Sequence, residues 1–420
     1  MRKTAPISAA LLALGLTACS GGADDGATTE LVLQTNWTSA GTESKPLKDA
    51  LASFTEKTGI TVKVLENGDD LNQVYETSLL AGEEADVLLV GLLEKQLDWA
   101  KNGAVVDVAD YVDEWGLTDA IPAAALADWT DSEGSLRGFP YAGFTWPWWY
   151  NTALLEEAGL EVPTTNDELI ATTDRLRELG YGGIATGGND WSGQKLFLQY
   201  IQTYMTPEET VKVFAEGRTC SSPAAMKGIE EFVRLRDAGV FVDGVEGLTS
   251  DQASALYLTG KALSSPMGSW AYQGTDAGIA STTYLGGMPV APGSTATKPL
   301  AYNGSTSAGW WISPNGAKKL DAVRKLVEHM FSTDVMSSMV VGGTVMATDV
   351  TLDVSKVESP LLQQSFTDLP GRVQWAVMPD LHVPADVSNP MYRATSIAFT
   401  KGNDAKTVCA MVDETYDAAR

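Results

Sequence analysis

An α/β fold is predicted by the order and the apolar pattern of the segments between residues 30 and 90. Short β-branched or apolar runs alternate there with runs of helical period, in the order strand, helix, strand, helix, strand. The run at 86–90 is almost wholly apolar, as expected of a strand buried on both faces. This order is typical of a parallel sheet with right-handed crossovers, in which ligands bind at the carboxyl ends of the strands.

The separate elements follow from local signals taken along the chain. The expected strands are 31–33, 61–65 and 86–90, and the expected helices are 44–57, 71–82, 165–180, 223–238 and 320–331. In the first helix we expect Ser44 to be the N-cap and Gly59 to end it. Thr165 and Glu168 have the spacing of a capping box, which predicts a helix start at this point.

Length and charge exclude several classes of protein. The chain has 420 residues, which suits two domains of ordinary size or three small ones, and 44% of them are hydrophobic. The formal net charge of −25 repels phosphate, which argues against binding of nucleic acid and against adhesion of the folded surface to anionic lipid. His329 and His382 are the only histidines, so neither a His-rich metal site nor a Ser-His-Asp enzyme is expected.

The N-terminus has the layout of a bacterial export signal. A basic start is followed by an apolar run at 7–16, too short to span a bilayer, so residues 1–18 are predicted to be a signal peptide. Cys19 follows Leu-Thr-Ala, which resembles a lipobox, and we expect it to be lipidated, with residues 19–29 as a flexible tether. The alternative is an ordinary secretion signal with an incidental cysteine.

Cys220 and Cys409 remain if Cys19 carries a lipid. Two leftover cysteines in an exported protein suggest a disulfide, and two unpaired buried thiols are the alternative.

The sequence contains no convincing nucleotide or nucleophile motif. Residues 180–185 match a loose G-x-G-x-x-A pattern, but they follow a helix where the fingerprint requires a strand, so we interpret them as a helix end and a loop. No P-loop and no G-x-S-x-G motif occurs. A pair of carboxylates at glycosidase separation remains open among so many acidic residues.

The 12 tryptophans are the most informative feature of the sequence, because they are clustered. Five of the seven residues at 144–150 are aromatic, and strand alternation places Phe144, Trp146, Trp148 and Tyr150 on one face and Trp149 on the other. Indole rings pack poorly in numbers, whereas a flat ring with a polar edge suits a pyranose sugar. We interpret Trp146, Trp191 and Trp270 as ligand contacts and leave Trp37 open between contact and core. Trp99, Trp115 and Trp129 are expected to pack in the core or on the surface.

These segments together resemble the sugar-type extracellular solute-binding proteins of bacterial ABC importers, the group that contains maltose-binding protein. The resemblance covers nearly all of the mature chain. The segments that carry it are 37–43, 54–62, 81–87, 138–141 with 150–151, 158–164, and Gly260-Lys261-Ala262 followed by Gly268-Ser269-Trp270. The chain departs from the pattern at 91–93, which lacks the usual aromatic or acidic residue and leaves that contact in doubt.

The family resemblance implies two α/β lobes joined by crossovers, with a ligand cleft between them that closes about a hinge. By this resemblance the N-terminal lobe comprises 30–143 plus 288–337, and the C-terminal lobe 144–287 plus 338–420. It implies a carbohydrate ligand, permease subunits of an ABC importer as partners, membrane attachment through the lipid alone, a monomer, and neither catalysis, cofactor nor metal. An exported glycoside hydrolase and a binding protein for another solute are the competing interpretations.

The resemblance also implies a set of contact residues. Carried over position by position, they are Trp37, Ser39 and Glu43 of the first lobe, Phe144 and Trp146 of the crossover strand, Asn189 and Trp191 of a second-lobe loop, Trp270 of the Gly-Ser-Trp motif and, more weakly, Tyr392. By the same analogy Cys220 and Cys409 share one lobe, so a disulfide between them would not cross the hinge.

Overall fold

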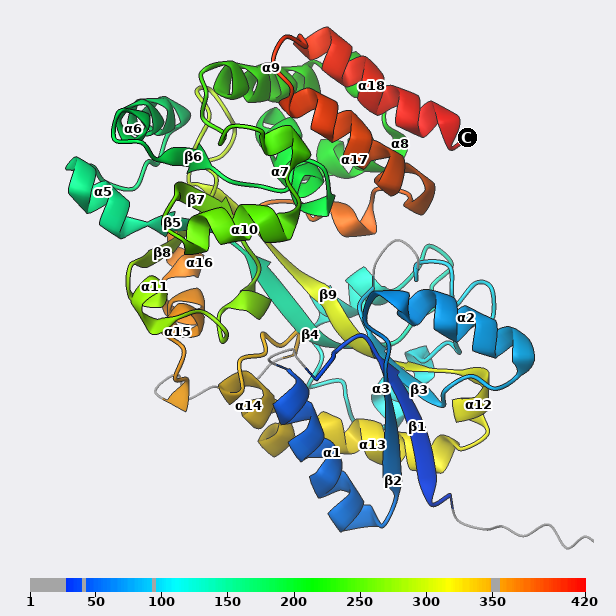
Figure 1. Cartoon of the computed structure of the whole chain (residues 1–420). Coiled ribbons are helices and arrows are strands. Elements are labelled where there is room, and N and C mark those ends of the chain that lie inside the picture. Colours follow the sequence, from blue (N-terminus) through cyan, green and yellow to red (C-terminus); the bar gives the residue numbers. More distant parts are fainter. Residues whose placement is uncertain (1–27, 40–42, 93–95, 349–355) are drawn as a thin grey trace, which may run out of the picture.

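Two β-sheets organise the chain in the computed structural model, which describes residues 28–39, 43–92, 96–348 and 356–420 (Figure 1). The strands are β1 (Glu30–Thr35), β2 (Thr61–Glu66), β3 (Val87–Val90), β4 (Phe139–Trp146), β5 (Trp148–Asn151), β6 (Gly182–Ile184), β7 (Ala262–Pro266), β8 (Thr283–Gly286), β9 (Leu300–Ile312) and β10 (Gln374–Trp375). We call the body around β1, β2 and β3 the first lobe and the body around β5 to β8 the second lobe.

The first sheet begins as the sequence predicts. β1 pairs in parallel with β2 on one side and with β3 on the other. β9 then pairs antiparallel with β3 and with β4, and β10 joins the first residues of β9 in parallel. The second sheet has the order β6-β7-β5-β8, in which β5 is antiparallel to both of its neighbours and β6 is parallel to β7.

β4 and β9 connect the two lobes, and Figure 1 shows them running side by side from one lobe to the other. In β4, Phe139 and Tyr141 belong to the core of the first lobe, whereas Phe144 and Trp146 belong to that of the second. β9 crosses in the opposite direction, because it begins in the second-lobe core and ends in the first.

Helices cover both sheets. They are α1 (Ser44–Thr58), α2 (Leu71–Ala81), α3 (Ala109–Glu114), α4 (Ala123–Trp129), α5 (Thr152–Ala158), α6 (Asn166–Glu178), α7 (Trp191–Ile201), α8 (Pro207–Glu216), α9 (Pro223–Asp237), α10 (Ser250–Leu258), α11 (Ala277–Ser281), α12 (Pro314–Ala317), α13 (Leu320–Met330), α14 (Thr333–Val341), α15 (Pro360–Thr367), α16 (Leu369–Arg372), α17 (Ala385–Phe399) and α18 (Ala405–Ala418). No helix of the described residues is long and apolar enough to cross a membrane.

The local start and stop signals are mostly confirmed. The predicted capping box is present at the start of α6, where the Thr165 side chain accepts the Glu168 backbone N–H and the Glu168 side chain bonds back. Gly59 and Gly82 end α1 and α2 in the left-handed conformation. Ser44 is not the cap of α1, because it already has helical conformation and the N-cap position falls on Glu43.

The aromatic segment at 144–150 is two strands instead of one, since the chain passes from β4 to β5 at Pro147. The alternation prediction is nevertheless confirmed. Phe144, Trp146, Trp148 and Tyr150 pack in one core cluster, and Trp149 packs in another with Tyr257 and Tyr272. Trp99, Trp115 and Trp129 are buried in the first-lobe core, as expected.

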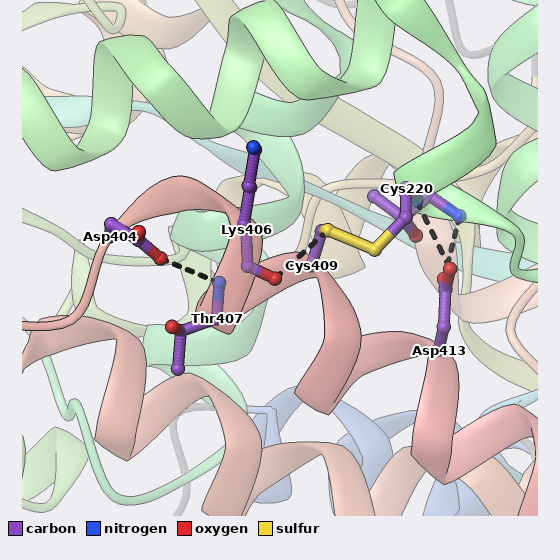
Figure 2. The surroundings of a disulfide bond; sticks show 7 residues. Cys220, Asp404, Lys406, Thr407, Cys409 and Asp413 are labelled. Carbon is purple, nitrogen blue, oxygen red and sulfur yellow. Dashed lines mark hydrogen bonds between the residues drawn. A yellow bond between two sulfur atoms is a disulfide. The ribbon is translucent and has the colours of Figure 1, made fainter.

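A disulfide joins Cys220 to Cys409 within the second lobe (Figure 2). The two Cα atoms are 5.2 Å apart although 189 residues separate them in the sequence. Cys409 lies on α18, and Cys220 lies in a short 3-10 turn whose backbone N–H groups at 219 and 220 donate to the carboxylate of Asp413. The bridge therefore attaches the last helix to the lobe without crossing the hinge strands. Cys19 and the signal peptide lie outside the described residues.

Candidate ligand site

A cavity of about 580 Å³ lies where the two lobes face each other. Its first-lobe side is lined by Asn36, Gly91, Thr306 and Ser307, and its second-lobe side by Phe144, Trp191, Gln194, Lys195, Trp270, Pro379, Asp380, Val383, Ser388 and Tyr392. Asn36 and Gly91 come directly after β1 and β3, so the cavity lies at the carboxyl ends of parallel strands. Its volume is within the range of about 300–1,000 Å³ that is usual for small-molecule sites.

Three aromatic rings form one wall of the cavity. The ring of Trp270 lies 6.1 Å from that of Phe144 and 6.0 Å from that of Trp191, centroid to centroid. Trp191 is the first residue of α7, where the side chain of Asp190 caps the helix by accepting the N–H of Ser192. Trp270 is 42% exposed, which is unusual for so large an apolar side chain. The plane of the Trp270 ring is tilted by 57° to that of Phe144 and by 55° to that of Trp191, so the wall offers apolar ring surface in more than one direction.

One ion pair supplies charge to the cavity. Lys195 Nζ lies 2.9 Å from a carboxylate oxygen of Asp380, and both side chains are almost buried. The same ammonium group lies 5.1 Å from the centroid of the Phe144 ring and 5.3 Å from that of Trp191, so it is held over the aromatic wall. The two charges cancel, so the pair adds no net charge to this end of the cavity. The ammonium group of Lys195 can donate hydrogen bonds and the carboxylate of Asp380 can accept them.

Two polar atoms in the lining have no hydrogen-bond partner among the described residues. They are the Oγ1 atom of Thr306, whose side chain is almost wholly buried, and Oδ1 of Asn36. A buried polar group without a partner costs about 1–3 kcal/mol. Both atoms are buried, so a ligand hydroxyl can reach them only if the surrounding side chains move.

Four of the nine predicted contact residues line this cavity, and they are Phe144, Trp191, Trp270 and Tyr392. Trp37 and Glu43 line a much smaller adjoining cavity, of about 10 Å³, which shares Trp270 and Ser307 with the main one. The structure therefore brings six of the nine residues to one region between the lobes.

The other three predicted residues lie elsewhere. The Ser39 hydroxyl donates to the carboxylate of Glu66 at 2.7 Å, and this hydrogen bond is the main cause that lowers the pKa of Glu66. Trp146 is wholly buried behind Trp191, with 6.4 Å between the ring centroids. Asn189 is exposed, and its backbone N–H donates to Leu248.

Sequence reasoning missed most of the polar lining. Lys195 follows Trp191 by four residues on the same helix, and this spacing, which puts both on one face, was a usable signal. Asp380 gave no such signal, because it lies in a short 3-10 turn 185 residues from its partner. Thr306 lies within the long strand β9, where a buried threonine is unremarkable.

Gly91 belongs to the segment where the sequence departs from the family pattern. It lines the cavity without a side chain, and a Cβ atom there would lie 2.9 Å from the carbonyl oxygens of Thr306 and Ser307. The close approach of β9 therefore requires glycine at this position. No group of three or more potential metal ligands occurs among the described residues.

A polar and aromatic cavity between two hinged α/β lobes defines a solute-binding protein of the two-lobe type. The chain belongs to the bacterial extracellular solute-binding protein family, whose model matches residues 36–337. Members of this family bind solutes outside the cytoplasm and are not enzymes.

Similar proteins agree with this assignment. A probable sugar-binding periplasmic protein of Rhizobium meliloti (strain 1021) is 29% identical over 246 residues, which are 56% of this chain and 57% of the relative. The chain thus spans about half the length of the curated relatives it matches. The crystal structure of a probable secreted solute-binding lipoprotein from Streptomyces coelicolor is 40% identical, with a TM-score of 0.84 over 94% of this chain and 100% of that one.

The fold is also shared with more distant proteins. The maltotriose-binding protein of Thermus thermophilus superposes with a TM-score of 0.68 over 93% of this chain and 100% of that one, at 18% identity. At this identity the likeness shows the fold alone.

Proposed function

We propose that the protein binds a neutral carbohydrate outside the cell and delivers it to the permease of an ABC importer when the lobes close. The observation that carries the proposal is the cavity between the lobes, where exposed indole faces lie beside buried polar atoms that need partners. Stacking on Trp270 and Trp191 supplies contact area, and sugar hydroxyls supply hydrogen bonds to Thr306, Asn36 and the Lys195–Asp380 pair.

The charge of the lining favours a neutral ligand. Lys195 and Asp380 are the charged residues of the described lining, and they neutralise each other at 2.9 Å. An acidic or basic sugar would have to compete with one of these partners, which costs binding energy in a desolvated site. Relatives whose names refer to sugar or to α-glucosides support a carbohydrate over a polyamine, iron or peptide.

Hydrolysis is not proposed. A glycosidase needs two carboxyl groups on either side of the scissile bond. Asp380 is the one carboxylate in the described lining of the cavity, and an ion pair with Lys195 occupies it.

Closure about the strands β4 and β9 is the proposed mechanism. The ligand binds residues of both lobes only in the closed form, so it shifts the population toward that form. The predicted lobes, 30–143 plus 288–337 and 144–287 plus 338–420, remain a proposal. The core contacts of α14 favour a first lobe that extends to Val341, because Met336 and Met339 of this helix pack in the first-lobe core.

Attachment to the membrane through lipidated Cys19 and a monomeric state complete the proposal. The similar protein from Streptomyces coelicolor, whose name describes it as a probable secreted lipoprotein, supports the anchor. Mass spectrometry of the protein purified from membranes tests it, since a diacylglycerol-modified N-terminal cysteine is expected and an unmodified N-terminus contradicts it.

Calorimetry tests the function itself. The soluble chain from residue 28 is titrated with neutral malto-, cello-, xylo-, manno- and chito-oligosaccharides, and saturable binding to at least one series is expected. The matched variant Lys195→Met should weaken that binding, because it removes the donor and leaves Asp380 unpaired. A folded protein that binds none of the series would contradict the proposal.

A further inference from the structure

A second hollow lies on the other side of the aromatic wall. We call it the outer groove, and its volume of about 600 Å³ is similar to that of the cavity between the lobes. Its walls include Ser250, Asp251, Ser254 and Leu258 of α10 together with Asp276 and Ile279 near α11. Trp191 and Trp270 line both hollows, so these two side chains form a ridge between them.

The ridge is held in place by local structure. The ring of Trp270 lies against the backbone of Gly268, and a Cβ atom at position 268 would overlap the ring. The backbone of Gly268 is extended, with φ −81° and ψ 162°, which any residue can adopt. Glycine is therefore needed there for the position of the ring and not for the turn. Trp191 is fixed as the first residue of α7.

The outer groove has the mixed chemistry of a sugar site. Hydroxyl groups of Ser250 and Ser254 and carboxylates of Asp251 and Asp276 stand beside the apolar side chains of Leu258, Ile279 and Met267. Such a surface can accept hydrogen bonds from sugar hydroxyls while packing against the C–H face of a ring. Its described lining contains acidic and no basic side chains, which disfavours uronic acids.

We propose that the outer groove is a second carbohydrate subsite, occupied by the part of an oligosaccharide that extends beyond the cavity and crosses the ridge at Trp270. The proposal rests on the carbohydrate function proposed above and specifies its ligand as a chain of neutral sugar units. The 42% exposure of Trp270 fits this role, because a ring that both neighbouring sugar units touch must be open on more than one side.

The expected consequence is a dependence of affinity on chain length. Monosaccharides and disaccharides of the series that binds occupy the cavity alone, whereas longer members also reach the groove. We expect affinity to rise by about tenfold or more when the chain becomes long enough to cross the ridge, as stacking on an aromatic ring contributes about that much.

A blocking variant and a matched control test the assignment by calorimetry. Ser254→Arg places a large side chain in the groove, because Ser254 is one of its lining residues. Ala255→Arg adds the same side chain to the same helix at an exposed position outside the groove lining. Both variants and the unmodified protein are titrated with each length of the series that binds, from the monosaccharide to the hexasaccharide.

Ser254→Arg should remove the gain for long chains and leave the affinity for the shortest ligand unchanged, and Ala255→Arg should change neither. The length dependence of the unmodified protein is a test that needs no variant. If affinity is flat with length, or if Ser254→Arg weakens short and long ligands equally, the outer groove is not a subsite although the carbohydrate function stands. If no series binds at all, the carbohydrate function itself fails.

Discussion

Tryptophan plays two different parts in this molecule, one in the core of the first lobe and the other at the ridge between the cavity and the outer groove. In the core, the rings of Trp99 and Trp129 are buried and each ring N–H donates to a named acceptor, Glu76 and the Ser305 carbonyl. Trp115 stacks on Tyr111 with the ring planes 5° apart. At the ridge, Trp191 and Trp270 face two hollows, and Trp270 is 42% exposed.

The surroundings of a tryptophan, and not its presence, separate a structural role from a role in binding. Core indoles gain from burial, and the ring N–H groups of Trp99 and Trp129 are also satisfied within the protein. The ridge indoles are only partly covered by the protein, so a ligand that covers the rest of their surface gains binding energy. Stability should therefore depend on the core residues and affinity on the ridge residues.

The largest effect is expected for Trp115→Ala. Removing a buried aromatic side chain leaves a cavity in the first-lobe core, so the free energy of unfolding should fall by about 3–5 kcal/mol. Urea denaturation followed by circular dichroism measures the change. The sugar affinity of the folded Trp115→Ala variant should equal that of the unmodified protein within the error of calorimetry. A clear loss of affinity at unchanged stability would show that Trp115 is not a core residue.

The disulfide separates stability from binding in the second lobe. Replacing Cys220 and Cys409 together by serine should lower the free energy of unfolding by about 2–5 kcal/mol, because the bridge closes a loop of 189 residues in the unfolded chain. Neither cysteine lines the cavity, so sugar affinity should not change. Thiol titration of the denatured, unreduced mature protein is the control, and two free thiols would show that the bridge does not form.

Trp270→Ala should have the reverse profile. Loss of stacking should weaken sugar binding by about 1–3 kcal/mol, measured by calorimetry, while the melting temperature hardly changes because the side chain is partly exposed. Unchanged affinity together with an unchanged melting temperature would contradict the role assigned to the ridge.

A smaller effect is expected for Gly268→Ala. The new methyl group would displace the Trp270 ring, so binding should weaken by about 1 kcal/mol, less than for removal of the ring. Gly247→Ala is the matched control, since nothing lies within 4 Å of a Cβ atom built there. Equal affinities of the two variants would show that the ring position does not depend on Gly268.

Much of the first lobe could be predicted from the sequence because its elements depend on local pattern. Apolar spacing located α1, α2 and β3, and the glycines at 59 and 82 marked the helix ends. Alternation correctly divided the aromatic segment between two faces. It could not tell which face would meet solvent, and Trp146 was assigned to the ligand although it is wholly buried behind Trp191.

The polar part of the site could not be predicted, since it depends on contacts between distant segments. Lys195 and Asp380 meet only after the chain has crossed between the lobes, and no local pattern links them. Ser39 lies in the expected loop, but its hydroxyl bonds to Glu66 and does not line the cavity. The Gly-Ser-Trp motif was the better signal, because its Trp270 lines the cavity.

We expect a sugar to lie between the lobes with its ring face against Trp270. A crystal structure of the protein with the tightest-binding neutral oligosaccharide would decide this. We expect a sugar ring stacked on Trp270, hydroxyl contacts to Thr306 of the first lobe and to the Lys195–Asp380 pair of the second, and lobes closed around the ligand. A sugar bound to one lobe alone, away from Trp270, would contradict it.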